Sequence, residues 1–188
     1  MLLLQNAQEI FDRFPEVDFG IYECPMPWKR LVSLDFLRKV APEGRMVFLK
    51  DTCCDYELIR ERLKAVEGTP LKIFNANAQS WYDSYCHGSA GYNGVMANFH
   101  PDLYKWAYDH KDSDPEKAQL VAHFLTTAAM IEMRAYPVSA KYHQNLVDVP
   151  MSLVTRSADA AKLDKNARGE VESLIAMENY VRKQLGIL

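Results

Sequence analysis

Short apolar runs alternate with amphipathic segments through the first part of the chain. The runs are too short for buried helices, whereas the segments between them carry apolar residues at helical spacing. The predicted strands cover residues 17–22, 46–50, 71–75 and 92–97. The predicted helices cover residues 1–14, 31–40, 55–66, 76–85 and 98–106, and either Thr52 or Asp55 can cap the third of them. Strands alternating with helices in this way are typical of βαβ units, so the pattern predicts an α/β fold with four parallel strands.

The pattern changes after Lys111, where strand signals stop. Asp114-Pro115 forms a good helix start and opens a long predicted helix that runs to about Arg134. A shorter helix at 138–144 and a final helix at 165–185 follow, the last one capped by Asp164. The sequence therefore predicts a strand-containing domain at 1–111 and an all-helical region at 112–188.

Lys50 stands at the end of the most apolar of these strands. Residues 46–49 are all apolar, and the run is bounded by Glu43-Gly44 before it and Asp51-Thr52 after it. In parallel α/β folds, chemistry takes place at the carboxyl ends of the strands. A lysine held there among apolar side chains loses hydration, which favours the neutral amine that attacks ketones and aldehydes to form a Schiff base. Taken alone, the run favours a lysine that extends into solvent.

Composition and charge narrow the possible functions. The chain has 188 residues, 48% of them hydrophobic, with a net charge of −3, which gives no indication of nucleic acid or an anionic membrane as partner. Its four cysteines include no C-x-x-C pair, and its five histidines show no metal-ligand spacing. We expect reduced thiols, a cytoplasmic location and no bound metal. No apolar run reaches membrane-spanning length.

Five motifs, taken in order, resemble the dihydrodipicolinate synthase / N-acetylneuraminate lyase family. Tyr22-Glu23-Cys24-Pro25 is similar to the family's Y-N-x-P motif, and Lys50-Asp51-Thr52 to its K-[DE]-[AST] motif. The other three matches are Asn75-Ala76-Asn77, the stretch from Gly88 to Pro101, and Tyr136-Pro137-Val138-Ser139-Ala140-Lys141. Members of this family are (β/α)8-barrel class I aldolases and synthases. The resemblance implies that this chain is the C-terminal half of such a barrel, strands five to eight, followed by a helical tail.

The resemblance also assigns roles to residues. Lys50 would carry the Schiff base with pyruvate or a related keto acid or aldehyde, and Tyr22 would relay protons to and from the carbinolamine. Five further residues would contribute to substrate binding: Pro25, Asn75, Asn77, Asn93 and Gly94. The reaction would need no metal and no added cofactor, because the protonated imine itself accepts electrons.

Two of the sequence's departures from the family pattern concern how the carboxylates of substrates would be bound. A complete barrel has eight strands, and no Gly-Thr-Thr motif for the substrate carboxylate occurs here. The synthases place a carboxylate-binding arginine two residues after the motif proline, where this chain has Pro27. Lys29 or Arg30 could replace that arginine, or both could be solvated residues at a helix start.

Three functions are compatible with these observations. The chain is the catalytic half of a class I aldolase, lyase or synthase, inactive or weakly active alone; or a non-catalytic half barrel; or a keto-acid-binding module. A half barrel exposes two sheet edges and an apolar inner face. We therefore expect a homo-oligomer or pairing with a chain that supplies the other half.

Overall fold

The computed structural model describes residues 2–187, and the chain forms two compact units, Met1–Gly94 and Val95–Leu188. The first unit holds every strand and the second is helical. The predicted boundary at 111/112 follows the change in secondary structure, whereas these units follow contacts within the chain. The domain division at 111/112 stays a prediction.

The first unit alternates strands and helices, as the apolar pattern predicts. In chain order its elements are α1 (Leu2–Arg13), β1 (Phe19–Tyr22), α2 (Leu34–Val40), the 3-10 turn η1 (Ala41–Glu43), β2 (Met46–Asp51), α3 (Tyr56–Ala65), β3 (Lys72–Asn75), α4 (Trp81–Cys86) and β4 (Gly91–Tyr92).

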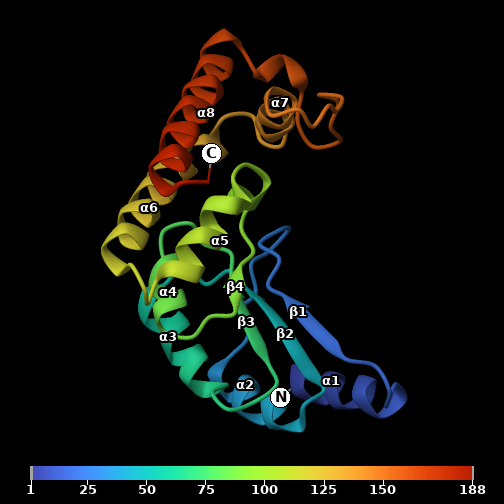
Figure 1. The fold of residues 1–188 in the computed structure, drawn as a ribbon. Helices are drawn as coiled ribbons and strands as arrows, with labels where there is room; N and C mark the ends of the chain where they lie inside the picture. The colour runs from blue at the N-terminus through green and yellow to red at the C-terminus, as the bar shows by residue number, and fades with distance from the viewer. Residues whose placement is uncertain (1, 188) are drawn as a thin grey trace. The chain divides into compact units, whose positions relative to one another are not determined.

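The four strands form one parallel sheet in the order β1-β2-β3-β4 (Figure 1). Sequential strands that neighbour each other in a parallel sheet are the arrangement that repeated βαβ units produce. The predicted four-stranded parallel architecture is therefore confirmed. β1 and β4 are the edge strands, since each pairs with one neighbour only.

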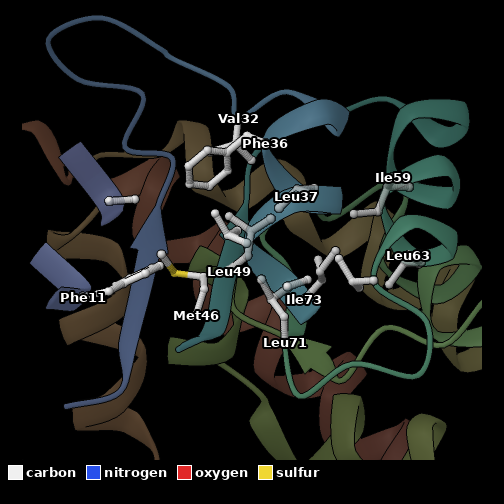
Figure 2. Packing of buried hydrophobic residues seen from close by; sticks show 14 residues of the cluster. Phe11, Val32, Phe36, Leu37, Met46, Leu49, Ile59, Leu63, Leu71 and Ile73 are labelled. Atoms are coloured by element: carbon white, nitrogen blue, oxygen red, sulfur yellow. The ribbon is translucent and has the colours of Figure 1, made fainter. Parts of the chain in front are cut away.

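A hydrophobic core joins one face of the sheet to α1, α2 and α3 (Figure 2). Leu49 and Ile73 from the central strands pack there with residues such as Phe36, Leu37 and Ile59 from the helices, all of them almost fully buried. Fully burying an aliphatic side chain contributes about 1.5–3 kcal/mol. This layer holds the strand ends, and therefore the candidate site, in place.

Side-chain caps explain where two helices of this layer begin. The Ser33 hydroxyl accepts a hydrogen bond from the Phe36 amide at 3.1 Å, at the start of α2. The Asp55 carboxylate accepts one from the Leu58 amide at 2.8 Å, at the start of α3. Each cap satisfies an amide that has no partner within its helix. Of the two candidate caps for α3, Thr52 and Asp55, the structure selects Asp55.

The fourth strand is much shorter than predicted. β4 comprises only Gly91 and Tyr92, and the predicted continuation to Ala97 is wrong because Val95–Asn98 forms the 3-10 helix η2. A Cβ at Gly94 would lie 2.1 Å from the Tyr92 hydroxyl oxygen, so the Tyr92 side chain folds back over this glycine. The chain turns at Gly94 rather than extending along the sheet.

The second unit consists of α5 (Pro101–His110), α6 (Pro115–Ala128), α7 (Val138–Leu146) and α8 (Lys165–Leu185), with 3-10 turns η2, η3 (Ala129–Met133) and η4 (Ala160–Lys162). The helix predicted to reach about Arg134 is α-helical only to Ala128, and its last turns tighten into η3. Asp164 caps α8 as predicted, because its carboxylate accepts a hydrogen bond from the Ala167 amide at 2.8 Å. Gly186 ends α8 in the left-handed conformation.

A buried charged cluster lies inside the second unit. The Glu178 carboxylate contacts His100 Nδ1 at 2.7 Å and His143 Nε2 at 3.0 Å, and all three side chains are inaccessible to solvent. Burial raises the pKa of Glu178, but the two imidazoles outweigh that effect and hold the pKa at about 2. Arg182 bonds Glu178 at 3.2 Å and pairs through two nitrogens with Asp102. The cluster joins α5, α7 and α8.

Candidate functional site

Tyr22 and Lys50 occupy facing positions at the ends of neighbouring strands. Tyr22 is the last residue of β1 and pairs in register with Lys50 of β2. Residues in register on adjacent strands project to the same side of a sheet. Leu49, the residue before Lys50, lies in the core with the helices, so Lys50 and Tyr22 project from the opposite face. The two predicted catalytic residues are therefore neighbours on the face that α1, α2 and α3 leave uncovered, the helix-free face of the first unit.

The Lys50 side chain lies over the Tyr22 ring. Its Nζ is 4.4 Å from the ring centroid, Lys50 is half-buried, and Tyr22 is 50% exposed. A cation over the face of an aromatic ring is stabilised by the negative electrostatic potential of that face. The ring therefore provides a fixed position for positive charge at the end of β2.

Two phenylalanines cover the rest of this face, in space left by glycines. Phe48 and Phe74 lie with ring centroids 5.1 Å apart, and Phe74 pairs in register with both Lys50 and Gly91. A Cβ at Gly91 would lie 2.7 Å from the Phe74 ring. The ring fits only because Gly91 has no side chain, and together with Phe48 it forms an apolar surface next to Lys50.

A buried ion cluster joins the residues that follow Tyr22 and Lys50 in the chain. The Arg62 guanidinium binds both oxygens of Glu23, at 2.9 and 3.0 Å, and also binds Asp51. All three side chains are inaccessible to solvent. Burial lowers the pKa of Arg62, but Glu23 and Asp51 outweigh it and raise the pKa above its ordinary value. The cluster holds the carboxyl ends of β1 and β2 together from the core side.

Glu23 also ties the chain after β1 to the chain after β2. Its carboxylate accepts hydrogen bonds from the Thr52 amide at 2.9 Å and the Val32 amide at 2.8 Å, and its carbonyl accepts one from the Thr52 hydroxyl at 2.7 Å. Arg62 donates to the Val32 carbonyl at 2.7 Å. The loop between Glu23 and Val32 is therefore anchored at both ends, beside Tyr22 and Lys50.

That loop forms a small cleft beside Tyr22. The cleft has a volume of about 350 Å³ and is lined by Tyr22, Cys24, Pro27, Trp28 and Arg30. Trp28 is 73% exposed. Of the two basic residues that follow the motif proline, Arg30 lines the cleft, whereas Lys29 contacts the chain after β2. The structure thus distinguishes Arg30 from Lys29, whereas the sequence leaves both as candidates to replace the carboxylate-binding arginine.

Asn75 lies away from the cleft. It follows Phe74 in β3 and so projects from the other face of the sheet, where it is 1% exposed. Its amide nitrogen donates to the Ser80 and Ser84 hydroxyls at 3.0 and 3.1 Å, and its amide oxygen accepts from the Asn77 amide at 2.7 Å. Every polar atom of this side chain is used to hold the loop before α4. Asn75 therefore has a structural role in this turn, and its predicted contact with substrate stays a prediction.

The remaining predicted binding residues are spread around the strand ends. The Asn77 side-chain oxygen accepts a hydrogen bond from the Ser80 amide at 2.9 Å, which starts the turn into α4. The Asn93 amide donates to the Asn75 carbonyl at 2.8 Å, and Gly94 lies beneath the Tyr92 side chain. Pro25 is an exposed residue of the loop after β1. These positions do not show whether the residues contact a substrate, so their binding roles stay predictions.

The cysteines near the site are free and differ from each other. Cys24 and Cys54 are exposed, whereas Cys53 is half-buried. Burial raises the pKa of the Cys53 thiol to about 12, and the hydrogen bond and charge of Asp51 contribute to the rise. Across residues 2–187, no three histidine, cysteine or acidic side chains are grouped so that they could hold a metal ion. No helix in the same range is long and apolar enough to cross a bilayer.

Sequence reasoning missed Trp28 and the Glu23–Arg62–Asp51 cluster. The available signal was the acidic residue directly after each predicted catalytic residue, Glu23 after Tyr22 and Asp51 after Lys50. Strand alternation sends these neighbours to the core side, where a buried acid needs a basic partner. Nothing local in the sequence identifies Arg62 as that partner. A cavity of about 1030 Å³ beside the start of α8 is lined by none of the predicted site residues.

Comparison with known proteins relates this chain to others through structure alone. No protein-family model and no curated protein matches the sequence. A monomeric dihydrodipicolinate synthase variant matches with a TM-score of 0.78 and 17% identity, over 99% of this chain and 60% of the other. The Thermotoga maritima dihydrodipicolinate synthase matches with a TM-score of 0.74 and 18% identity, over 99% and 61%.

A third match is the chloride-inhibited dihydrodipicolinate synthase of Acinetobacter baumannii, whose structure contains pyruvate. Its TM-score is 0.77 and its identity 16%, over 93% of this chain and 59% of the other. At these identities the matches show a shared fold. The chain spans about 60% of the length of the solved chains it matches. The predicted resemblance to this fold is confirmed, and so is a half-barrel architecture of four parallel strands.

Proposed function

We propose that Lys50 forms a Schiff base with the carbonyl carbon of pyruvate or a related keto acid or aldehyde, in the manner of a class I aldolase, lyase or synthase. The observation that carries the proposal is the Tyr22–Lys50 pair at the carboxyl ends of adjacent parallel strands. In parallel α/β folds, this edge of the sheet is where substrates bind. The shared fold with solved dihydrodipicolinate synthases supports the same reaction class.

The chemistry follows from the two side chains. The neutral Lys50 amine adds to the carbonyl carbon to give a carbinolamine, which loses water to give the imine. The Tyr22 hydroxyl donates and accepts the protons of these steps, since a tyrosine is mostly protonated at neutral pH. The Tyr22 ring lies where it would also stabilise the positive charge of the protonated imine. That cation accepts electrons when a carbon–carbon bond next to it forms or breaks.

Arg30 supports a substrate that carries a carboxylate. It lines the cleft that Tyr22 borders, and a guanidinium binds a carboxylate through two parallel hydrogen bonds. A keto acid with its carbonyl carbon at Lys50 would direct its carboxylate past Tyr22 into the cleft, toward Arg30. A neutral aldehyde would use Lys50 alone.

Borohydride reduction in the presence of pyruvate tests the proposal. Reduction converts an imine into a stable secondary amine, which peptide mapping locates. We expect Lys50 to be labelled preferentially and the label to disappear in Lys50→Ala. Lys72→Ala is the matched control, because Lys72 is an exposed lysine at the start of the next strand. Labelling of Lys72 and other exposed lysines to the same extent as Lys50 would overturn the proposal.

A second candidate function is assembly without catalysis. The helix-free face carries Phe48, Lys50 and Phe74 only half-buried, and the edge strand β1 ends in the exposed Tyr22. Such a surface pairs with another sheet edge or another copy of the chain. We propose a homo-oligomer or a complementing half barrel as the partner. Sedimentation over a hundredfold range of concentration tests the homo-oligomer: a mass that stays monomeric throughout argues against it.

A further inference from the structure

The cleft beside Tyr22 combines two aromatic rings with one positive charge. Tyr22 and Trp28 supply the rings and Arg30 the guanidinium, and none of the described residues that line the cleft is acidic. Its volume of about 350 Å³ is within the usual range of small-molecule sites, and a cavity of about 150 Å³ is enough to hold benzene. The cleft therefore has room for an aromatic ring as well as for the carboxylate that Arg30 would bind.

The loop that carries Trp28 is anchored, yet the indole itself is left in solvent. At the ends of the loop, the Val32 amide donates a hydrogen bond to the Glu23 carboxylate at 2.8 Å. In its middle, Lys29 Nζ lies 3.5 Å from the Cys53 carbonyl oxygen. Trp28 is nevertheless 73% exposed. The chain fixes the position of this loop without using the indole to do so.

Exposure alone does not distinguish Trp28 from its neighbours in the loop. Met26 is 74% exposed, about as much as Trp28, and it does not line the cleft. Single apolar side chains at a surface are common and indicate no function. Trp28 differs because it forms one cleft with the Tyr22 ring, and a concave, mainly apolar surface with one charged group is typical of a ligand site. The face of the indole is therefore available to a ring that enters this cleft.

We propose that the substrate of this site is an α-keto acid whose side chain carries an aromatic ring. The proposal rests on the Schiff base at Lys50 and specifies the class of keto acid that forms it. A bond forms between the Lys50 nitrogen and the carbonyl carbon, and the carbonyl oxygen leaves as water with the two amine hydrogens. The aromatic ring takes part in no bond change. It lies against the Trp28 indole while the carboxylate pairs with Arg30.

Tyr22 connects the reacting amine to the cleft. Lys50 Nζ lies 4.4 Å from the centre of the Tyr22 ring, and the same tyrosine lines the cleft together with Trp28. A ring one methylene away from the carbonyl carbon therefore extends past Tyr22 into the cleft. Paired aromatic rings attract each other by more than the apolar area they bury. An aryl keto acid should accordingly bind more tightly than an aliphatic one with a side chain of similar bulk.

Reductive trapping with a series of α-keto acids tests the proposal. Pyruvate, α-ketoisocaproate and phenylpyruvate carry a methyl, an isobutyl and a benzyl group, and cyanoborohydride fixes their imines for peptide mapping. We expect half-maximal labelling of Lys50 at an about tenfold lower concentration of phenylpyruvate than of pyruvate, with α-ketoisocaproate between them. Trp28→Ala should reduce the preference for phenylpyruvate to that for α-ketoisocaproate. Met26→Ala is the matched control, because Met26 is an equally exposed residue of the same loop outside the cleft, and it should keep the full preference.

A ligand that forms no imine separates this proposal from the one for Lys50. Phenyllactate has a hydroxyl group in place of the keto group, so it can bind in the cleft without reacting. In a nuclear magnetic resonance titration, the indole N–H signal of Trp28 is the one that Trp28→Phe lacks. We expect phenyllactate to shift this signal and lactate to leave it in place at the same concentration. If no keto acid labels Lys50, the Schiff-base proposal fails, and this titration still decides whether an aromatic acid binds at Trp28.

Two results would overturn the proposal. One is labelling of Lys50 that shows no preference for phenylpyruvate, or a preference that Trp28→Ala leaves intact. The other is a Trp28 signal that does not respond to phenyllactate and shifts only with protein concentration, which would make this surface a contact between copies of the chain. Far-ultraviolet circular dichroism of each variant establishes that the fold is retained, so that a lost preference reports binding rather than unfolding.

Discussion

Replacing Arg62 by methionine tests the cluster that supports the candidate site. Arg62 is the cation that binds Glu23 and Asp51, and all three side chains are inaccessible to solvent. Methionine fills much of the same space without a charge. The change therefore leaves two buried carboxylates close together, with no cation between them. It also removes the donor to the Val32 carbonyl.

The expected cost is large. Removing one partner of a buried ion pair typically destabilises a protein by about 3–5 kcal/mol, because the remaining charge stays desolvated and unpaired. Natural domains have a total free energy of unfolding of about 5–15 kcal/mol, so this change removes roughly a fifth or more of it. The cost should be smaller at acidic pH, since a proton on either carboxyl relieves the repulsion between them.

Urea unfolding followed by circular dichroism measures the difference. Arg60→Met is the matched control, because Arg60 lies on the same helix and pairs with Asp83 while remaining 37% exposed. A surface pair contributes much less than a buried one, so Arg60→Met should shift the midpoint far less. Equal midpoint shifts for the two variants would refute the reasoning, since the buried cluster would then have no special role.

Three further changes test other parts of the molecule. The pKa of Glu178 falls from its ordinary 4.5 to about 2 on folding, so its carboxylate stabilises the fold above pH 4.5 by roughly 3 kcal/mol. This stabilisation is lost as the pH falls toward 2. An acid titration of the stability of Glu178→Gln should not show this loss. Gly91→Ala should cost about 1–3 kcal/mol in urea unfolding, because the new Cβ meets the Phe74 ring at 2.7 Å. Asp164→Ala should cost about 1 kcal/mol by the same assay, through loss of the α8 cap.

The parts of the fold that the sequence predicted correctly are those that depend on local patterns. The apolar runs that became β1, β2 and β3 are bounded by turn residues, and Asp55 and Asp164 cap helices through amides only three residues away. The pairing of Tyr22 with Lys50 came from the family resemblance, and it agrees with the rule that consecutive βαβ units put consecutive strands next to each other. The other inferences need only the neighbouring sequence.

The parts that could not be predicted depend on distant partners. Glu23 meets Arg62 across 39 residues, and His100 meets Glu178 across 78. No periodicity links such pairs, and a buried charge is indistinguishable from a surface charge until its surroundings are known. The predicted length of the fourth strand was wrong for a related reason. The Tyr92 side chain folds over Gly94, and the pattern of hydrophobic and polar positions does not reveal that contact.

The buried cluster also explains how one sheet edge can hold the Tyr22–Lys50 pair in position. Strand alternation sends Tyr22 and Lys50 to the helix-free face and sends Asp51, the residue after Lys50, to the core. Arg62 binds Asp51 and Glu23 on the core side, so any movement of one strand end relative to the other would break buried ionic contacts. Such movement is costly, and the position of Lys50 over the Tyr22 ring is therefore maintained by buried groups on the opposite face of the sheet. A site that must place an amine next to a tyrosine benefits from support of this kind, because the supporting charges are kept away from the reacting atoms.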